Sequence, residues 1–332
     1  MTTHTHHLTE HAGRDGYAYS GGSVGAGSQF RDGLLVAPAF DRLLRENHLD
    51  SLDALFANSI GERLDKPGLP TWRQRWRLTL RDPPGPPLCK TPPSPPFARV
   101  GGVGPRTFYL KRFSDPPASA RREVRRSGTG AKSVAGLEWA WMNRLARDGV
   151  PCARPVALAE ELRGLREVRS VIVTEAVRGD SLERWAAQWT WADRATVRAL
   201  IGVLAKLVAR LHAGGYVHRD LYLSHIFFDP AAPLTDSLCL IDLQRMIRPT
   251  GGLGRWIVKD LAALNYSASP TRGDATGPSD VVSRADRLRW LKLYLGAVKL
   301  DGSARRLAYR VIGKTLRIQR RDARRRLREH IG

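Results

Sequence analysis

The sequence predicts an α+β protein in which short strands precede long amphipathic helices. Strand patterns occur in the alternating residues 76–80, in the alternating residues 107–113 and in the apolar run 171–173. Two longer segments, 133–149 and 193–213, carry apolar residues three or four positions apart, which is typical of helices. A chain of 332 residues with 42% hydrophobic content is long enough to bury a sizeable core around these elements.

The segment 216–243 places two acids at the ends of a predicted hairpin. Residues 226–228 and 238–241 are apolar and β-rich, and the turn formers PAAPLTDS separate them. Asp220 stands shortly before the first strand and Asp242 directly follows the second. Two carboxylates at one end of a rigid hairpin suit phosphoryl transfer, in which one orients the attacking hydroxyl and the other holds magnesium on the nucleotide phosphates.

The residues around these acids carry a family resemblance. The motif HRDLYLSH resembles the H-R-D catalytic loop of the protein-kinase fold, and Asp242, in IDLQ, stands where the D-F-G aspartate would be. His225 replaces the metal-binding Asn of protein kinases. These variations, together with RWIVKDLAALNYSA and SRADRLRWLKLYLG, resemble the lipopolysaccharide kinase (Kdo/WaaP) family over residues 50 to 300.

The resemblance implies a two-lobed, protein-kinase-like fold. A small β-rich N-lobe, about residues 50–175, and a larger α-helical C-lobe, about 176–302, are expected to enclose a nucleotide cleft within a domain spanning 34–302. We expect short helices in 38–56, a weak strand in 56–63 and, before the second strand, a loop that covers phosphates without a G-x-G-x-x-G motif. Residues 1–33 read as a flexible segment and 83–96 as a proline-rich insertion.

The resemblance also implies roles for single residues in the N-lobe. Lys111 is expected to hold nucleotide phosphates, and Glu138, on the helix 133–149, to pair with it. The hinge between the lobes falls at Thr174, Glu175 and Ala176, where backbone groups are expected to meet the adenine edge.

In the C-lobe the expected roles centre on Asp220, which would orient the acceptor hydroxyl. His218 and Arg219 would hold the loop by packing and pairing. Tyr222 would line the acceptor site or pack, and His225 would bond a phosphate or the catalytic loop, since magnesium prefers oxygen to imidazole. Asp242 is then the one firm metal ligand, and Asp260, at the start of a predicted helix, the structural anchor of the loop.

On this resemblance the chain is expected to be an ATP-dependent phosphotransferase that uses ATP and Mg²⁺. The implied acceptor is a hydroxyl of a lipopolysaccharide inner-core sugar, heptose or Kdo. A protein kinase or another small-molecule kinase would share every motif and stays open. A pseudokinase scaffold is disfavoured because Lys111, Glu138, Asp220 and Asp242 are all present, and only charge suggests a nucleic-acid-binding protein.

The net charge of +22 allows nucleic acid, an anionic membrane or a phosphorylated substrate as partner. Residues 303–332 hold eleven Lys or Arg against two acids, with an apolar stripe at Leu307, Val311 and Ile318. This basic helix is expected to contact the anionic membrane that carries a lipid-anchored glycan substrate; a solvated terminal helix is the alternative. The sequence has no apolar signal core, no apolar run long enough to span a membrane and no cysteine spacing typical of disulfides. We therefore expect a cytoplasmic protein that is peripheral on the inner membrane.

Overall fold

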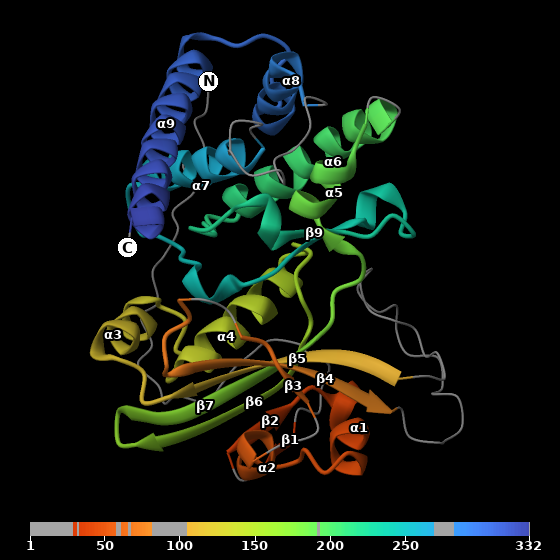
Figure 1. The fold of residues 1–332 in the computed structure, drawn as a ribbon, viewed down its shortest axis with the longest axis vertical. Coiled ribbons are helices and arrows are strands. Elements are labelled where there is room, and N and C mark those ends of the chain that lie inside the picture. The colour runs from red at the N-terminus through yellow and green to blue at the C-terminus, as the bar shows by residue number, and fades with distance from the viewer. Residues whose placement is uncertain are drawn as a thin grey trace, which may run out of the picture.

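The computed structural model describes residues 29–31, 33–57, 61–65, 68–81, 105–190, 193–268 and 282–331. Figure 1 shows two lobes, a twisted sheet with its covering helices and, above it, a lobe made mainly of helices. The proline-rich segment 83–96 and residues 1–28 lie outside the described residues. The predicted α+β, two-lobed architecture is confirmed.

The described part of the N-lobe is built on a sheet of seven antiparallel strands. Their spatial order is β1-β2-β6-β7-β5-β4-β3. The bounds are β1 Gln29–Arg31, β2 Leu34–Val36, β3 Glu62–Arg63, β4 Arg73–Arg81, β5 Pro105–Ser114, β6 Pro155–Arg163 and β7 Arg166–Glu175. The last three strands of this order, β5, β4 and β3, form a meander at one edge of the sheet. Lys111 lies on β5.

The two faces of the sheet pack against different layers. In Figure 1, α1 (Asp41–Glu46) and α2 (Leu52–Ala57) lie on one face, and α4 (Val134–Arg147) lies on the other, between the sheet and the helical lobe. On β5, Phe108 and Leu110 are fully buried. The ring of Phe108 packs edge-on against Phe40, the residue just before α1. Because side chains alternate along a strand, Thr107, Tyr109 and Lys111 face α4 and the space between the lobes.

Helix α4 begins as the sequence predicts. The Ser133 side chain accepts a hydrogen bond from Gly136 N, which satisfies one of the free N–H groups of the first turn. Leu137, Trp141 and Leu145 are buried on one face. This packing fixes the position of Glu138, which is itself fully buried.

The C-lobe consists of helices around a small sheet. Its helices are α5 Leu182–Gln188, α6 Arg194–Ala213, α7 Leu253–Ser267, α8 Arg284–Leu295 and α9 Gly302–Ile331. The predicted hairpin is confirmed as β9 (Ile226–Phe228) and β10 (Leu238–Leu240), with β8 (Asp180–Ser181) completing a three-stranded sheet. Side chains of all five helices also line an open, mainly apolar pocket of about 900 Å³.

Several boundaries differ from the sequence expectations. Residues 52–57 form α2, so the described part of the expected strand 56–63 is a strand only at Glu62–Arg63. Gln29–Arg31 of the expected flexible segment pairs with β2 as β1. The basic stretch after β5 forms an unexpected helix, α3 (Ala118–Arg126). Helix α7 begins at Leu253, so Asp260 lies in its middle.

The basic C-terminal helix is present as α9, at the side of the C-lobe in Figure 1. Its predicted apolar stripe is used inside the protein, since Ile318 and Val311 pack with Ala262 and Tyr266 of α7. Tyr266 also donates a hydrogen bond to Asp322, 2.7 Å away. A second apolar row, Tyr309, Leu316 and Leu327, is exposed. No helix in the described residues is long and apolar enough to cross a membrane.

Candidate active site

Lys111 lies at the centre of a charged cluster between the lobes. Its Nζ is 2.6 Å from Glu138 Oε1 on α4 and 3.0 Å from Oδ1 of Asp242, which stands two residues after the end of β10. Residues from both lobes therefore meet at one ammonium group. The Lys111–Glu138 contact is the pair that the family resemblance implied, whereas the contact of Lys111 with Asp242 was not part of that expectation.

The charges of this cluster reinforce one another. Burial disfavours the charged form of Lys111, but Asp242 and Glu138 outweigh it and raise the Lys111 pKa. Burial raises the pKa of Asp242, but the positive charges of Lys111, His225 and Arg75 outweigh burial and hold this pKa well below its usual range. Both groups are therefore ionised at neutral pH.

Backbone strain is concentrated beside the same residues. Four non-glycine residues of the described chain have positive φ, and two of them are Arg219, at +69°, and Asp242, at +59°. A non-glycine residue in this region costs of the order of 1 kcal/mol or more. Such strain is often found at functional sites, where the surrounding contacts hold a side chain in position.

Asp260 holds the catalytic loop from below. Its two carboxylate oxygens accept hydrogen bonds from the backbone N–H groups of His218, at 2.7 Å, and Arg219, at 2.8 Å. Asp260 is fully buried, and His212 Nε2 lies 3.4 Å from Oδ2. The geometry matches the anchoring contact that the sequence analysis expected.

The two histidines of the loop are stacked, with ring centroids 5.9 Å apart. His218 Nε2 donates to the carbonyl of Ile241, and burial lowers the His218 pKa. His225 Nδ1 donates to the backbone carbonyl of Asp220 at 2.7 Å, and its Nε2 lies 3.8 Å from Asp242 Oδ2. His225 therefore bonds the catalytic loop and leaves its second nitrogen facing the cleft.

The carboxylate of Asp220 is engaged by a residue that the sequence analysis did not single out. Arg245 Nη1 lies 2.9 Å from both carboxylate oxygens. Arg245 belongs to the 3-10 turn Leu243–Arg245 that follows Asp242. Arg219 pairs with Glu123 of α3. Tyr222 packs edge-on to His225 and is also near Ile318 of α9.

A second overlooked residue approaches Asp242 from the sheet. Arg75 lies opposite Lys111 in the β4–β5 register, and its Nη2 is 3.5 Å from Asp242 Oδ2. Arg73, two positions earlier on the same face, donates to Gln244 Oε1 at 2.8 Å. The sequence does place arginines at every second position, 73, 75 and 77, which puts them on one face of a strand. The predicted strand began at Trp76, so Arg73 and Arg75 were not assigned to it.

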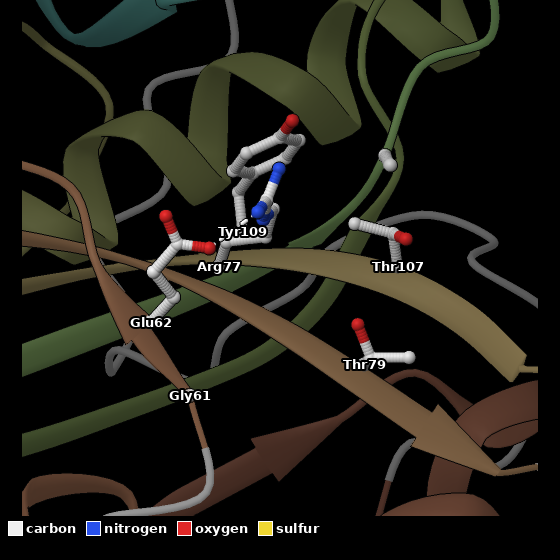
Figure 2. A pocket seen from close by; sticks show the side chains of 7 residues that line it. Gly61, Glu62, Arg77, Thr79, Thr107 and Tyr109 are labelled. Carbon is white, nitrogen blue, oxygen red and sulfur yellow. Dashed lines mark hydrogen bonds and ion pairs between the residues drawn. The ribbon is translucent and has the colours of Figure 1, made fainter.

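A cavity of about 590 Å³ opens beside the cluster, on the same face of the sheet. Figure 2 shows Tyr109 and Arg77 rising together from the strands, with Glu62 beside them and Thr79 and Thr107 further along. Arg77 pairs with Glu62 of β3. Ala176, in the connection between the lobes, closes the other side. The cavity thus joins the hinge to the lysine strand.

The hinge residues differ in part from the expectation. The N–H of Glu175 donates to Arg154 O and that of Ala176 to Thr107 O, both at 3.0 Å, so these two groups are already bonded within the protein. The Glu175 side chain faces away from the cleft and pairs with Arg106 at 2.6 Å. Thr174 Oγ1 donates to Tyr109 O. Only Ala176 reaches the cavity.

A two-lobed fold with this Lys-Glu-Asp cluster between the lobes defines a protein of the protein-kinase-like class. Residues 119–294, more than half of the chain, match the lipopolysaccharide kinase (Kdo/WaaP) family. The chain belongs to this family.

Curated relatives support the assignment over the same region. The lipopolysaccharide core heptose(I) kinase WaaP of Pseudomonas aeruginosa is 30% identical over 167 residues, 48% of this chain and 59% of the relative. That of Escherichia coli K12 is 30% identical over 168 residues, 49% of this chain and 60% of the relative. The matched stretches thus span about three fifths of the relatives' length.

A solved structure shares the overall fold. The solved structure of WaaP in complex with acyl carrier protein aligns with a TM-score of 0.55 and 25% sequence identity. The alignment covers 88% of this chain and 98% of the solved chain. The likeness therefore extends beyond the region that the sequence matches cover.

Proposed function

We propose that the protein is an ATP-dependent phosphotransferase whose acceptor is a hydroxyl of a lipopolysaccharide inner-core sugar, heptose or Kdo. The observation that carries this proposal is the contact of Lys111 with both Glu138 and Asp242. It supports a nucleotide site in which one ammonium is held where phosphates arrive. The names of the relatives, heptose(I) kinases, supply the acceptor.

The roles follow from the positions of the side chains. Lys111 neutralises nucleotide phosphates, and Glu138 keeps its ammonium in place. Asp220 accepts the hydrogen bond of the acceptor hydroxyl and aligns its oxygen with the phosphorus atom. Arg245, whose Nη1 lies 2.9 Å from both oxygens of the Asp220 carboxylate, would hold this group in place while its remaining lone pairs accept the hydroxyl. Phosphoryl transfer is then a matter of alignment and charge neutralisation.

The residues present fit a magnesium ion that nucleotide phosphates share. Asp242 is ionised and supplies a hard oxygen ligand, which Mg²⁺ prefers. The described residues hold no group of three or more His, Cys, Asp or Glu that would bind a metal alone. Asp242 would therefore hold Mg²⁺ together with the nucleotide phosphates, and the ion would neutralise part of their charge.

The cavity beside Tyr109 fits the nucleoside. It lies between Ala176 of the hinge and the strands that lead to Lys111 and Arg75. The N–H groups of Glu175 and Ala176 are occupied, so the base would be recognised by the aromatic ring of Tyr109 and the hydroxyls of Thr79 and Thr107. Base stacking on an aromatic ring tolerates different bases.

The direct test is transfer of labelled phosphate from ATP to an inner-core saccharide in the presence of Mg²⁺. Saccharides that end in Kdo, or that carry heptose beyond it, would identify the phosphorylated sugar, and a generic protein substrate would test the protein-kinase alternative. Phosphate on a saccharide supports the proposal. Phosphate on the protein substrate alone would contradict it.

Membrane contact through α9 belongs to the same proposal. Tyr309, Leu316 and Leu327 are 75%, 46% and 62% exposed, and their spacing of seven and eleven residues aligns them on one helical face. Arginines flank this row along the helix. An exposed apolar row with basic flanks suits the surface of an anionic membrane. There a lipid-anchored glycan is within reach of the cytoplasmic protein.

We also propose an acyl carrier protein as a partner. The support is the solved complex of WaaP with acyl carrier protein, because the alignment covers 98% of the solved chain. Co-purification of the tagged protein with an added acyl carrier protein tests this directly. A stable complex on gel filtration supports the proposal, and separate elution at micromolar concentrations would argue against it.

A further inference from the structure

Helix α8 reaches the support of the catalytic loop through one tyrosine. The hydroxyl oxygen of Tyr294, near the end of this helix, lies 2.8 Å from Nδ1 of His212 on α6. The other nitrogen of the same ring, Nε2, lies 3.4 Å from Oδ2 of Asp260 on α7. Asp260 in turn accepts hydrogen bonds from the backbone N–H groups of His218 and Arg219. A continuous chain of hydrogen bonds therefore joins α8 to the backbone of the catalytic loop.

The chemistry of these side chains gives each bond a direction. A carboxylate can only accept, so the hydrogen of the His212 ring lies on Nε2 and points to Asp260. In the neutral ring Nδ1 is then an acceptor, and the Tyr294 hydroxyl donates to it. Burial, and Asp260 to a smaller degree, raise the pKa of Tyr294, so this hydroxyl keeps its hydrogen at neutral pH.

The chain is shielded from water, and packing restricts the tyrosine. Asp260 is fully buried and His212 is nearly so. The rings of His212 and Tyr294 meet edge to face, with centroids 5.7 Å apart. Trp290, one turn earlier on α8, stacks almost parallel to the Tyr294 ring with its centroid 5.2 Å away. Because water cannot easily replace a buried donor, loss of the hydroxyl would leave His212 Nδ1 without its hydrogen bond.

Helix α8 is itself fixed to the two helices that carry the chain of bonds. Asp286, in its first turn, pairs with Arg194 at the start of α6, 2.6 Å away. Arg287 donates to the side chain of Asn265 at 2.8 Å and to the carbonyl of Ala268, both at the end of α7. These contacts make α8 a brace between α6 and α7.

The loop at the far end of this chain is under backbone strain. Arg219 has a φ of +69°, which is unfavourable for a residue with a side chain. The bond from its N–H group to Asp260 is one of the contacts that hold it there. Residues persist in such conformations only where the surrounding structure fixes them. A shift of Asp260 would therefore move the backbone that leads directly into Asp220.

We propose that Tyr294 is a positioning residue for phosphoryl transfer. It acts through His212 and Asp260 to fix the backbone that directs Asp220 at the acceptor hydroxyl, and it takes no part in binding the nucleotide or the acceptor. This inference rests on the proposed function and adds a residue of α8 to those on which that function depends. The alternative is a tyrosine that only stabilises the fold.

The first experiment needs no turnover. Hydrogen–deuterium exchange, followed by mass spectrometry, measures how readily the amides of residues 216–222 open in the wild-type protein and in Tyr294→Phe, which keeps the ring and loses the hydroxyl. The matched control is Tyr266→Phe, because Tyr266 lies on the same helix as Asp260 and its hydroxyl bonds Asp322. Each variant thus loses one tyrosine hydrogen bond.

Exchange in 216–222 should be about tenfold faster in Tyr294→Phe, the factor expected when one hydrogen bond of a buried network is lost. The control should exchange as the wild type does in this segment. His212→Leu, which removes both ring nitrogens, should also speed exchange there. Adding Tyr294→Phe to His212→Leu should change it no further, because Tyr294 acts only through His212.

Wild-type exchange of this segment in Tyr294→Phe would overturn the inference. An equal increase in helices across the whole protein would also overturn it, because a merely stabilising residue acts on global unfolding and not on local opening. Additive effects of Tyr294→Phe and His212→Leu would contradict the route through His212.

The second experiment measures phosphate transfer by the same variants. In Tyr294→Phe, kcat should fall about tenfold while KM for ATP stays unchanged, because a small misplacement of Asp220 slows alignment and leaves Lys111 and Asp242 untouched. Normal kcat despite faster exchange would count against the inference. If the wild-type protein transferred no phosphate to any saccharide, the proposed function would fail, and exchange would still decide whether Tyr294 holds the loop.

Discussion

Arg75 lies directly opposite Lys111 in the register of β4 and β5, and both side chains approach the carboxylate of Asp242. The Nε atom of Arg75 is buried and has no hydrogen-bond partner in the described part of the structure. The loop before β4 has no run of glycines to wrap phosphates with backbone N–H groups. We therefore propose that the guanidinium of Arg75 binds nucleotide phosphate in place of such backbone N–H groups.

The first prediction therefore concerns Arg75. Arg75→Gln should weaken ATP binding about tenfold or more, because contacts with charged groups contribute about 1.5 to 3 kcal/mol. Titration with a fluorescent ATP analogue measures the change. Arg81→Gln, on the exposed end of the same strand, is the matched control. Unchanged affinity in Arg75→Gln would remove Arg75 from the nucleotide site.

The second prediction separates stability from binding at the Lys111–Glu138 pair. Glu138 is fully buried, and its Oε2 has no hydrogen-bond partner among the described residues. Lys111→Met should lower the free energy of unfolding by about 3 kcal/mol, since it leaves a buried carboxylate without its cation. Adding Glu138→Gln should recover much of this loss without restoring ATP binding. Urea unfolding measures the first effect and nucleotide titration the second.

If the double variant were as unstable as Lys111→Met, the buried carboxylate would not be the cause. If the double variant bound ATP normally, Lys111 would have no part in the nucleotide site. The two measurements thus test the structural and the functional role of one contact independently.

The third prediction concerns pH and Glu167, a buried residue of β7 whose carboxyl group contacts the first turn of α4. Its Oε2 accepts a hydrogen bond from Val134 N, and burial raises its pKa from 4.5 to about 7. Between these values the folded protein keeps a proton that the unfolded chain has lost. Stability should therefore fall as pH rises through this window, and the loss should be complete above it.

Glu167→Gln removes this titration while keeping the shape of the side chain. At pH 5 the variant should be about as stable as the wild type, and at pH 8 it should be more stable, by up to roughly 3 kcal/mol. Chemical unfolding at the two pH values gives the comparison. A stability difference that is the same at pH 5 and pH 8 would mean that Glu167 does not titrate in this range.

The fourth prediction concerns the exposed face of α9. Tyr309→Ser with Leu316→Ser should reduce sedimentation with anionic liposomes and leave transfer to a soluble saccharide unchanged, because both residues are exposed and neither lines the cavity beside Lys111. Truncation of α9 is a poorer test, since Ile318 packs on α7 and Tyr266 bonds Asp322. Salt near 0.5 M should have the same effect as the substitutions by screening the arginines. Undiminished binding to anionic liposomes would contradict membrane contact through this face.

Local patterns in the sequence were sufficient for much of the fold. The cap at Ser133, the leucine spacing of α6 and the turn formers between β9 and β10 each specify an element without distant contacts. The strand expected in 56–63 was wrong at its start, because Phe56 and Ala57 belong to a short helix, and correct at its end, where Glu62–Arg63 form β3. Tertiary packing decides such short apolar segments more than periodicity does.

The candidate site was predictable where a motif carries it. Two contacts that the resemblance implied are present: Lys111 pairs with Glu138, and Asp260 accepts hydrogen bonds from the backbone of the H-R-D segment. Arg75 and Arg245 were not predictable in the same way, since the chain has 54 basic residues and only strand register or turn geometry selects these two. Likewise, nothing in sequence shows that the hinge N–H groups are bonded internally.

The most direct test of the proposed phosphoryl transfer measures two properties of Asp220→Asn and Asp242→Asn with ATP, Mg²⁺ and an inner-core saccharide. Asp220→Asn should bind Mg²⁺-ATP as the wild type does and transfer phosphate about 10² to 10⁴ times more slowly. Asp242→Asn should lose both magnesium-dependent binding and transfer. Near-normal transfer by either variant would contradict the conclusion that these two carboxylates carry phosphoryl transfer to a sugar hydroxyl.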